Sequence, residues 1–304
     1  FKRYVLLFRV KVQEYAGADM GRYRKILVAV DGSDSSKNAF RQACKIARQD
    51  ASWITVITTI PFYQDLFQMP SIQEKVSKTL REDGEKVISE IKKIANEEDA
   101  FIRPILEEGS PVTTIVDAAA ENNFDLIVMG RHGKSHLERA LVGSVTARVI
   151  GHSRGDVLVI PKGAVVGWSK ILISTDGSKY STAATEKAID LAKSYGGQLE
   201  AVSVVDVTEE FHTEAPGAVE ELVRKAKGFV DDVREKAGTH GIKTEVLVRE
   251  GETFKVITDL SKEYKTDVIV MGSHGRTGMN RLLMGSVTEK VIGYALCPVL
   301  VVKV

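Results

Sequence analysis

Short runs of apolar, mostly β-branched residues recur along the chain, with longer amphipathic stretches between them. In the first half the apolar runs cover 25–30, 54–60, 101–106, 125–129 and 157–161. In the second half they cover 170–175, 199–205, 244–248, 267–271 and 299–303. Several are apolar at consecutive positions, as in ILVAV and VIVM. This pattern is typical of strands that are buried on both faces of a parallel sheet.

The stretches between these strands carry apolar residues at the spacing of one helix face. In the first half one such face consists of Ile72, Val76, Leu80, Val87, Ile91 and Ile94. Its counterpart in the second half consists of Val219, Leu222, Val223, Ala226, Phe229, Val230 and Val233. Because strand and helix alternate strictly, the sequence predicts an α/β protein built from doubly wound parallel sheets with helices on both faces.

The second half of the sequence repeats the first. KILVAVDGS, which begins at Lys25, returns as KILISTDGS at Lys170, 145 positions later. DLIVMGRHG at Asp125 returns as DVIVMGSHG at Asp267, 142 positions later, and the segments GSVT and VLVI (VLVV in the second half) keep that offset. The offset changes once, by three residues, as expected when a duplicated domain has lost residues from one surface loop. We therefore expect two tandem domains at 22–162 and 168–304.

The two expected domains are joined by a linker at 163–167, which is short enough to predict that they pack together. Residues 1–21 precede the first domain. Their apolar run, Val5–Phe8, is shorter than the core of a signal peptide (~7–15 residues) or a membrane helix (~20 residues). Two interpretations of residues 1–19 stay open: an artefact of translation from upstream of Met20, or a genuine short strand or arm.

Composition narrows the class of protein. The 304 residues are 43% hydrophobic and 27% charged, as in a soluble globular protein. The 42 basic and 41 acidic residues leave a net charge of +1, which argues against bulk nucleic-acid binding. The two cysteines, Cys44 and Cys297, both lack a CxxC partner, so neither a disulfide framework nor a thiolate zinc site is expected. A reducing cytoplasm fits this usage best.

A fixed glycine spacing follows the fourth strand of each half: glycine, two residues, glycine, nine residues, then Gly-Ser. The positions are Gly130, Gly133, Gly143 and Ser144, and then Gly272, Gly275, Gly285 and Ser286. Glycine lets backbone approach a ligand closely, and the helix that Gly-Ser opens has free N–H groups and a dipole that favour an anion. The spacing therefore predicts a phosphate-binding cradle. The alternative is a structural turn followed by a serine-capped helix, which duplication would copy equally well.

A carboxylate ends the first strand of each half, at Asp31 and at Asp176, within the sequence Asp-Gly-Ser. In a doubly wound sheet, ligands bind above the carboxyl ends of the strands that flank the reversal of strand order. A carboxylate at such a place, together with the glycine spacing, favours a binding site over a purely structural turn.

These motifs together resemble the universal stress protein family. The resemblance rests on VAVDGS, on G-x2-G-x9-G-S after LIVMG or VIVMG, and on the terminal VLVI or VLVV, and it covers both halves. It implies a five-stranded parallel sheet of order 3-2-1-4-5 in each domain. It also implies ATP, ADP or AMP as ligand, with Mg²⁺ held through the phosphates and with neither a metal site nor a catalytic residue in the protein itself.

The resemblance also assigns roles to single residues. The nucleoside is bordered by Asp31, Ile60 and Met129 in the first half and by Asp176, Val205 and Met271 in the second. The phosphates are wrapped by Gly130, Gly133, Gly143, Ser144 and Val145, and by Gly272, Gly275, Gly285, Ser286 and Val287. Helix capping remains the alternative for the aspartates, and core packing for the methionines. Thr146 and Thr288 either help the cradle or lie on the helix surface.

The two copies differ around the glycines. Arg131-His132 and Lys134-Ser135-His136 stand where the second copy has Ser273-His274 and Arg276-Thr277-Gly278. The cations either reach a γ-phosphate or are solvated. No carboxylate or second histidine stands at a telling spacing from His132 or His274, so we do not expect catalysis. Strand two ends in Thr-Thr-Ile-Pro in the first copy and in the more usual Ser-Val-Val-Asp in the second, which favours the second copy as the occupied site.

We expect a cytoplasmic, adenine-nucleotide-binding stress or signalling protein. Its apolar last strands, 157–160 and 299–302, should pair within the chain as an internal pseudo-dimer; a homodimer of whole chains is a further option. Neither a nucleic acid nor a membrane is expected as partner. The aromatic segment 61–71 is interpreted as packing on its own domain, with a lid, a partner surface or an N-terminal cap on the following helix as alternatives. The alternative functions are a slow Mg-dependent ATPase or phosphotransferase, and a scaffold with vestigial nucleotide sites.

Overall fold

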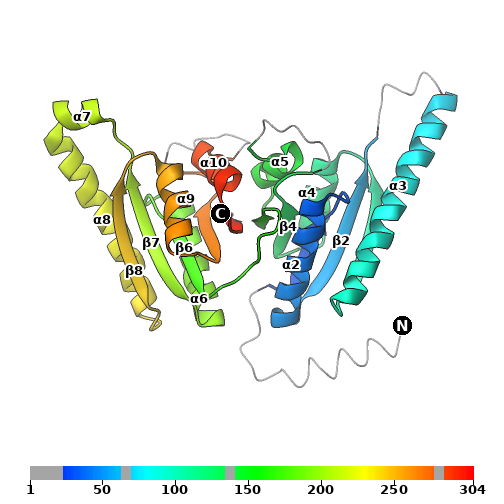
Figure 1. Cartoon of the computed structure of the whole chain (residues 1–304), viewed down its shortest axis with the longest axis horizontal. Coiled ribbons are helices and arrows are strands. Elements are labelled where there is room, and N and C mark those ends of the chain that lie inside the picture. Colours follow the sequence, from blue (N-terminus) through cyan, green and yellow to red (C-terminus); the bar gives the residue numbers. More distant parts are fainter. Residues whose placement is uncertain (1–22, 63–69, 134–140, 277–283) are drawn as a thin grey trace.

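The computed structural model describes residues 23–62, 70–133, 141–276 and 284–304 (Figure 1). The expectations for residues 1–21, for most of the aromatic segment, for Lys134-Ser135-His136 and for Thr277-Gly278 lie outside these ranges.

Each half folds around five parallel strands. The first half contributes β1 (Lys25–Ala29), β2 (Trp53–Ile60), β3 (Ile102–Glu108), β4 (Leu126–Gly130) and β5 (Asp156–Ile160). The second contributes β6 (Lys170–Ser174), β7 (Gln198–Val205), β8 (Thr244–Glu250), β9 (Val268–Gly272) and β10 (Val299–Val302). The order is β3-β2-β1-β4-β5 in one half and β8-β7-β6-β9-β10 in the other, with every pair inside a half parallel. The predicted α/β class and strand order are confirmed.

Helices cover both faces of the sheet, as the apolar strands require. The first half has α2 (Asp34–Asp50), α3 (Pro70–Glu97), α4 (Pro111–Glu121) and α5 (Ser144–His152). The second has α6 (Lys179–Tyr195), α7 (Glu209–Glu214), α8 (Pro216–Gly238), α9 (Thr253–Glu263) and α10 (Ser286–Tyr294). Buried side chains of α2, α3, α6 and α8 share one apolar core, and those of α4, α5, α9 and α10 share the core on the other face.

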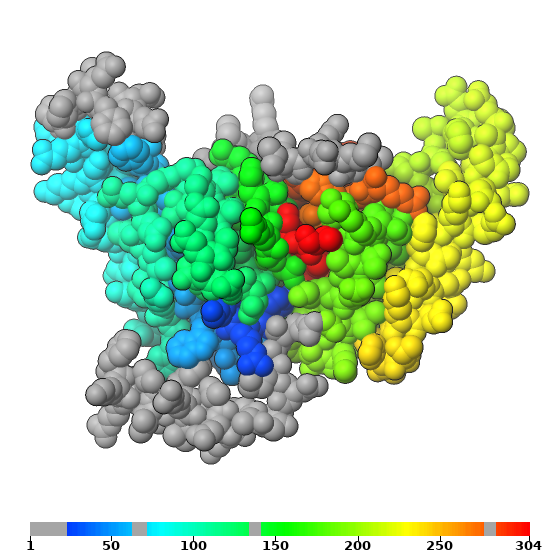
Figure 2. Space-filling view, turned by 180° about the vertical axis from the view of Figure 1, so that it is seen from behind, coloured from blue at the N-terminus to red at the C-terminus, as the bar shows by residue number. Residues whose placement is uncertain are grey.

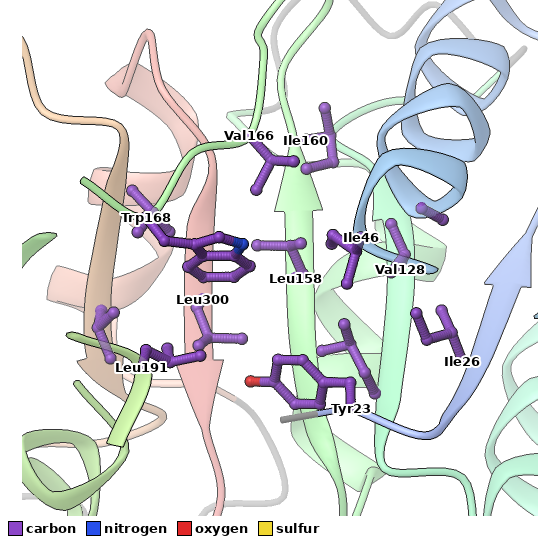
Figure 3. Close-up of a cluster of buried hydrophobic side chains, with 14 of the residues drawn as sticks. Tyr23, Ile26, Ile46, Val128, Leu158, Ile160, Val166, Trp168, Leu191 and Leu300 are labelled. Atoms are coloured by element: carbon purple, nitrogen blue, oxygen red, sulfur yellow. The ribbon is translucent and has the colours of Figure 1, made fainter. Parts of the chain in front are cut away.

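The last strands of the two halves pair with each other, as predicted. β5 and β10 are antiparallel, and Leu158 lies opposite Leu300. This pairing joins the two sheets into one sheet of ten strands among the residues described. Both leucines are fully buried, and Figure 3 shows them in one cluster with Trp168. Pairing therefore covers two apolar edges that would otherwise be exposed.

The segment between the halves is held by α2. Asn38 donates hydrogen bonds to the carbonyls of Pro161 and Ala164, and Lys45 donates to the carbonyl of Val166. Further down the same helix, Asp50 accepts a 2.6 Å hydrogen bond from the Tyr195 hydroxyl of the second half. Figure 2 shows from behind that the two halves are in contact. The red surface of the last residues lies between the green surface of the first half and the orange and yellow-green surface of the second.

Candidate functional site

The predicted aspartates and glycines meet at the carboxyl edge of the sheet. β1 pairs with β4, and β6 pairs with β9, so the loops that follow these strands lie side by side. A Cβ on Gly133 would collide with a carboxylate oxygen of Asp31. A Cβ on Gly275 would lie 2.9 Å from a carboxylate oxygen of Asp176. In each half the middle glycine therefore lets the loop approach the aspartate.

The first and last glycines of each pattern have structural roles of their own. A Cβ on Gly130 would lie 2.8 Å from the backbone of Ser35, and one on Gly272 would lie 2.7 Å from the backbone of Tyr180. The first glycine of each pattern thus lets a helix approach the end of a strand. The last glycine closes the loop: the Gly143 N–H donates to the carbonyl of Arg131 at 2.9 Å, and the second half repeats this bond.

The helices that follow the loops begin without a capping side chain. Gly143 and Gly285, not the serines, are the N-cap residues of α5 and α10, so the alternative in which the serines cap these helices is wrong. The N–H groups of the first turn therefore have no side-chain acceptor at the cap and point toward the loop, an arrangement that favours an anion.

Two buried threonines fix these helices to the sheet. The Thr146 hydroxyl donates to the carbonyl of Gly130 at 3.0 Å, and the Thr288 hydroxyl donates to the carbonyl of Gly272 at the same distance. Both side chains are buried, so neither lies on the helix surface.

The aspartates organise the turn after the first strand. Asp31 accepts hydrogen bonds from the backbone and the hydroxyl of Ser33, and Ser33 in turn caps α2. Asp176 accepts a hydrogen bond from the backbone N–H of Ser178. Burial by itself raises the pKa of Asp176, but hydrogen bonds from Ser178, Ser181 and Arg276 outweigh that effect, so its pKa lies below the ordinary value. This carboxylate is ionised at neutral pH and can accept hydrogen bonds from hydroxyl groups.

One cavity in the first half, of about 440 Å³, collects the predicted residues. It is lined by all eight of them: Asp31, Ile60, Met129, Gly130, Gly133, Gly143, Ser144 and Val145. From the polar loop it extends along the end of β2 to an apolar wall on α3, where Leu80 and Val87 lie. A polar end that favours anions and an apolar end beside it are typical of a small-ligand pocket.

The corresponding place in the second half is arranged differently. Phe229 of α8 stands 142 positions after Val87, and its ring packs directly against the backbone of Gly177. The guanidinium of Arg276 lies 4.6 Å from the centre of that ring, and the backbone N–H of Arg276 donates to the Asp176 carboxylate at 2.9 Å. An aromatic ring and a cation thus cover the end of β6. The remaining predicted residues of this half lie at the ends of β7 and β9 and in the first turn of α10: Val205, Met271, Gly272, Ser286 and Val287.

Comparison with known proteins decides the family. The model of the universal stress protein family matches residues 22–161 and again residues 167–303. The chain belongs to the universal stress protein family. A universal stress protein of Methanocaldococcus jannaschii is 39% identical over 140 residues, 45% of this chain and 82% of that protein. One of Mycolicibacterium smegmatis is 26% identical over 297 residues, 91% of this chain and 96% of that protein.

The solved structures agree on the fold. A universal stress protein from Archaeoglobus fulgidus has a TM-score of 0.71 and 23% identity, and the match covers 92% of this chain and 96% of that one. Relatives matched over nearly their whole length support the tandem form of the family.

The sequence did not predict some of the residues that line the cavity of this universal stress protein. The wall on α3 includes Asp83 and Gly84, and α4 adds Pro111 and Ile115. Leu80 and Val87 were visible as part of a helix face, and a glycine inside a helix is itself a signal of close packing. A Cβ on Gly84 would lie 2.7 Å from the side chain of Leu106.

Within the described residues, no group of three or more His, Cys, Asp or Glu side chains is placed to hold a metal ion. No helix in the same residues is long and apolar enough to cross a membrane.

Proposed function

We propose that this universal stress protein binds an adenine nucleotide, ATP or ADP/AMP, in the cavity of its first half, and acts in stress response or signalling. The observation that carries the proposal is the convergence of all eight predicted residues on one cavity of about 440 Å³. That volume lies in the range of about 300–1,000 Å³ that is usual for ligand pockets. On this proposal, 22–162 and 168–304 are the two nucleotide-binding units.

The chemistry of the cavity fits each part of a nucleotide. The phosphates would bind the first-turn N–H groups of α5 and the backbone of Gly133 and Gly143, where the helix dipole favours negative charge. The Asp31 carboxylate would accept hydrogen bonds from the ribose hydroxyls. The base would pack between Ile60 and the apolar wall of α3. A magnesium ion would be held by the phosphates.

Contacts in the second half support the first half as the main site. The sequence favours the second copy, because its strand two ends in the more usual way. In the structure, however, Phe229 and Arg276 lie over the end of β6, whereas Val87 leaves room in the first half. A nucleotide in the second half would have to displace the Arg276 side chain.

A matched pair of glycine variants tests the proposal. A side chain at Gly143 would meet backbone atoms of Arg131 and His132 at 3.2 and 3.3 Å, and one at Gly285 would meet the equivalent atoms of Ser273 and His274 at 3.4 and 3.3 Å. Gly143→Val and Gly285→Val therefore strain their loops similarly but block different sites. Ligand at a hundredfold excess over Kd stabilises the native state by about 2.7 kcal/mol.

We expect millimolar ATP to raise the Tm of the parent and of Gly285→Val, and to leave the Tm of Gly143→Val almost unchanged. Loss of the shift in Gly285→Val alone would move the main site to the second half. An equal shift in all three proteins would place the nucleotide outside both cradles.

A further inference from the structure

One side chain of the first cradle crosses into the second half. Arg131 stands between Gly130 and Gly133, and its backbone belongs to the cradle: its N–H donates to Ile160 at 3.1 Å, and its carbonyl accepts from Gly143 at 2.9 Å. Its side chain leaves the cradle, so the expectation that this cation reaches a phosphate or is solvated is wrong for Arg131.

The guanidinium of Arg131 binds the end of α10. One nitrogen lies 3.3, 2.9 and 3.0 Å from the carbonyl oxygens of Ile292, Gly293 and Ala295. Ile292 and Gly293 belong to the last turn of the helix, where carbonyl groups have no partner within the helix, and Ala295 is its C-cap residue. A cation there also interacts favourably with the negative end of the helix dipole.

A second contact joins the same two elements. Leu141, two residues before Gly143, packs against the backbone of α10 so closely that a Cβ on Gly293 would lie 2.7 Å from the Leu141 Cβ. The first cradle thus contacts the last turn of α10 from both of its ends. The opposite end of α10 begins at Ser286, after the N-cap residue Gly285, and this end belongs to the second cradle. The helix has nine residues, about 13 Å at 1.5 Å per residue.

Among the described residues, the arginine link is not repeated in the other direction. Ser273 takes the place of Arg131 in the second copy, 142 positions later, and is itself buried. The last turn of α5 instead accepts a hydrogen bond from Lys303, whose ammonium lies 2.6 Å from the carbonyl of Ile150. Lys303 follows β10 and belongs to neither cradle. Both cations cap a helix of the other half, and of these two residues only Arg131 stands in a cradle.

We propose that Arg131 couples the two nucleotide sites of this chain, so that a nucleotide in the first cradle strengthens binding in the second. This inference rests on the proposed function. Phosphate bound at Gly133 and Gly143 fixes the backbone of Arg131, and the guanidinium and Leu141 then hold α10 in one position. A ligand that binds the second cradle then loses less conformational entropy, because α10 is already ordered. Binding at the two sites is therefore positively cooperative. We expect filling of the first site to raise the affinity of the second at least about five-fold, the lower end of usual coupling factors.

The test follows backbone amide resonances of the full chain in the Gly285→Val background, where saturating ATP fills only the first cradle. The amides of Gly133 and Gly143 report occupancy, and those of Ser286, Val287 and Thr288 report the far end of α10. We expect both groups to shift on adding ATP. Adding Arg131→Met should abolish the shift in α10 at saturation. Adding Lys303→Met, the matched control, should preserve it.

The outcomes separate this inference from the proposed function. If Gly133 and Gly143 do not respond to ATP, the first cradle binds no nucleotide and the proposed function fails. If they respond while α10 does not, or if α10 responds equally with Arg131→Met, the coupling is wrong. Loss of the α10 response with Lys303→Met would also overturn it, because any weakening of the interface would then suffice. Should Arg131→Met not fold, Leu141→Ala tests the same link and should reduce the response.

Discussion

At the scale of single residues, Glu200 is an unfavourably placed ionisable group of the second half. It lies on β7 and only 2% of it is exposed. One carboxylate oxygen accepts a 3.2 Å hydrogen bond from Gln198, while the other has no hydrogen-bond partner among the described residues. Burial raises the pKa of Glu200 above its ordinary value, and the bond from Gln198 only partly opposes this. Ionising this side chain therefore disfavours the folded state.

The sign of this effect gives a prediction. The folded protein holds the Glu200 proton more tightly than the unfolded chain does, so Glu200 lowers stability as pH rises above 4.5, the ordinary value. Glu200→Gln removes the charge at nearly constant volume. We expect it to raise the free energy of unfolding at pH 7 by about 1–3 kcal/mol and to change it little at pH 4. Urea denaturation of the parent and the variant at pH 7 and pH 4 measures these free energies. An equal stabilisation at the two pH values would contradict the raised pKa of Glu200.

At the scale of elements, the strands were the most predictable part of the molecule. Runs such as 126–130 are buried on both faces, so their sequence carries the signal of a strand directly. The cradles were predictable because they are defined by local spacing. The wall of the cavity was not, because which turn of α3 faces β2 depends on how the helix packs. Whether a helix end is capped by serine or glycine is decided by backbone angles that the sequence leaves open.

The difference between Val87 and Phe229 gives a prediction at this scale. Val87 is 5% exposed and lines the cavity of the first half, while the Phe229 ring covers Gly177 in the second. Val87→Phe should fill the base end of the first site and weaken ATP binding at least about tenfold, or about 1.4 kcal/mol. Phe229→Val should strengthen binding in the second half. Calorimetric titration measures the first change in the Gly285→Val background and the second in the Gly143→Val background. Unchanged affinity in Val87→Phe would place the base elsewhere.

At the scale of the whole molecule, the sequence predicted both the duplication and the pairing of the last strands. The asymmetry between the halves was not. In the sequence, Phe229 belongs to a helix face and the two arginines, Arg131 and Arg276, are cations beside the glycines, but only the packed halves show what these residues contact. One apolar core extends through both halves, so the chain should unfold in a single cooperative transition rather than half by half.

The pairing of β5 with β10 gives the last prediction. Leu158 and Leu300 lie opposite each other and are fully buried, so Leu158→Asp with Leu300→Asp would place two like charges face to face in the core. Opening the interface between the two halves would hydrate both charges. This does not require either half to unfold. We expect the double variant to show a larger radius of gyration in small-angle scattering and two unfolding transitions, with its helical circular dichroism largely kept. Leu158→Lys with Leu300→Asp is the matched control, because opposite charges at the same two positions can pair and should keep the chain more compact. If both variants are as compact as the parent, strand pairing is not what holds the halves together, and the contacts of α2 with residues 161–166 must suffice.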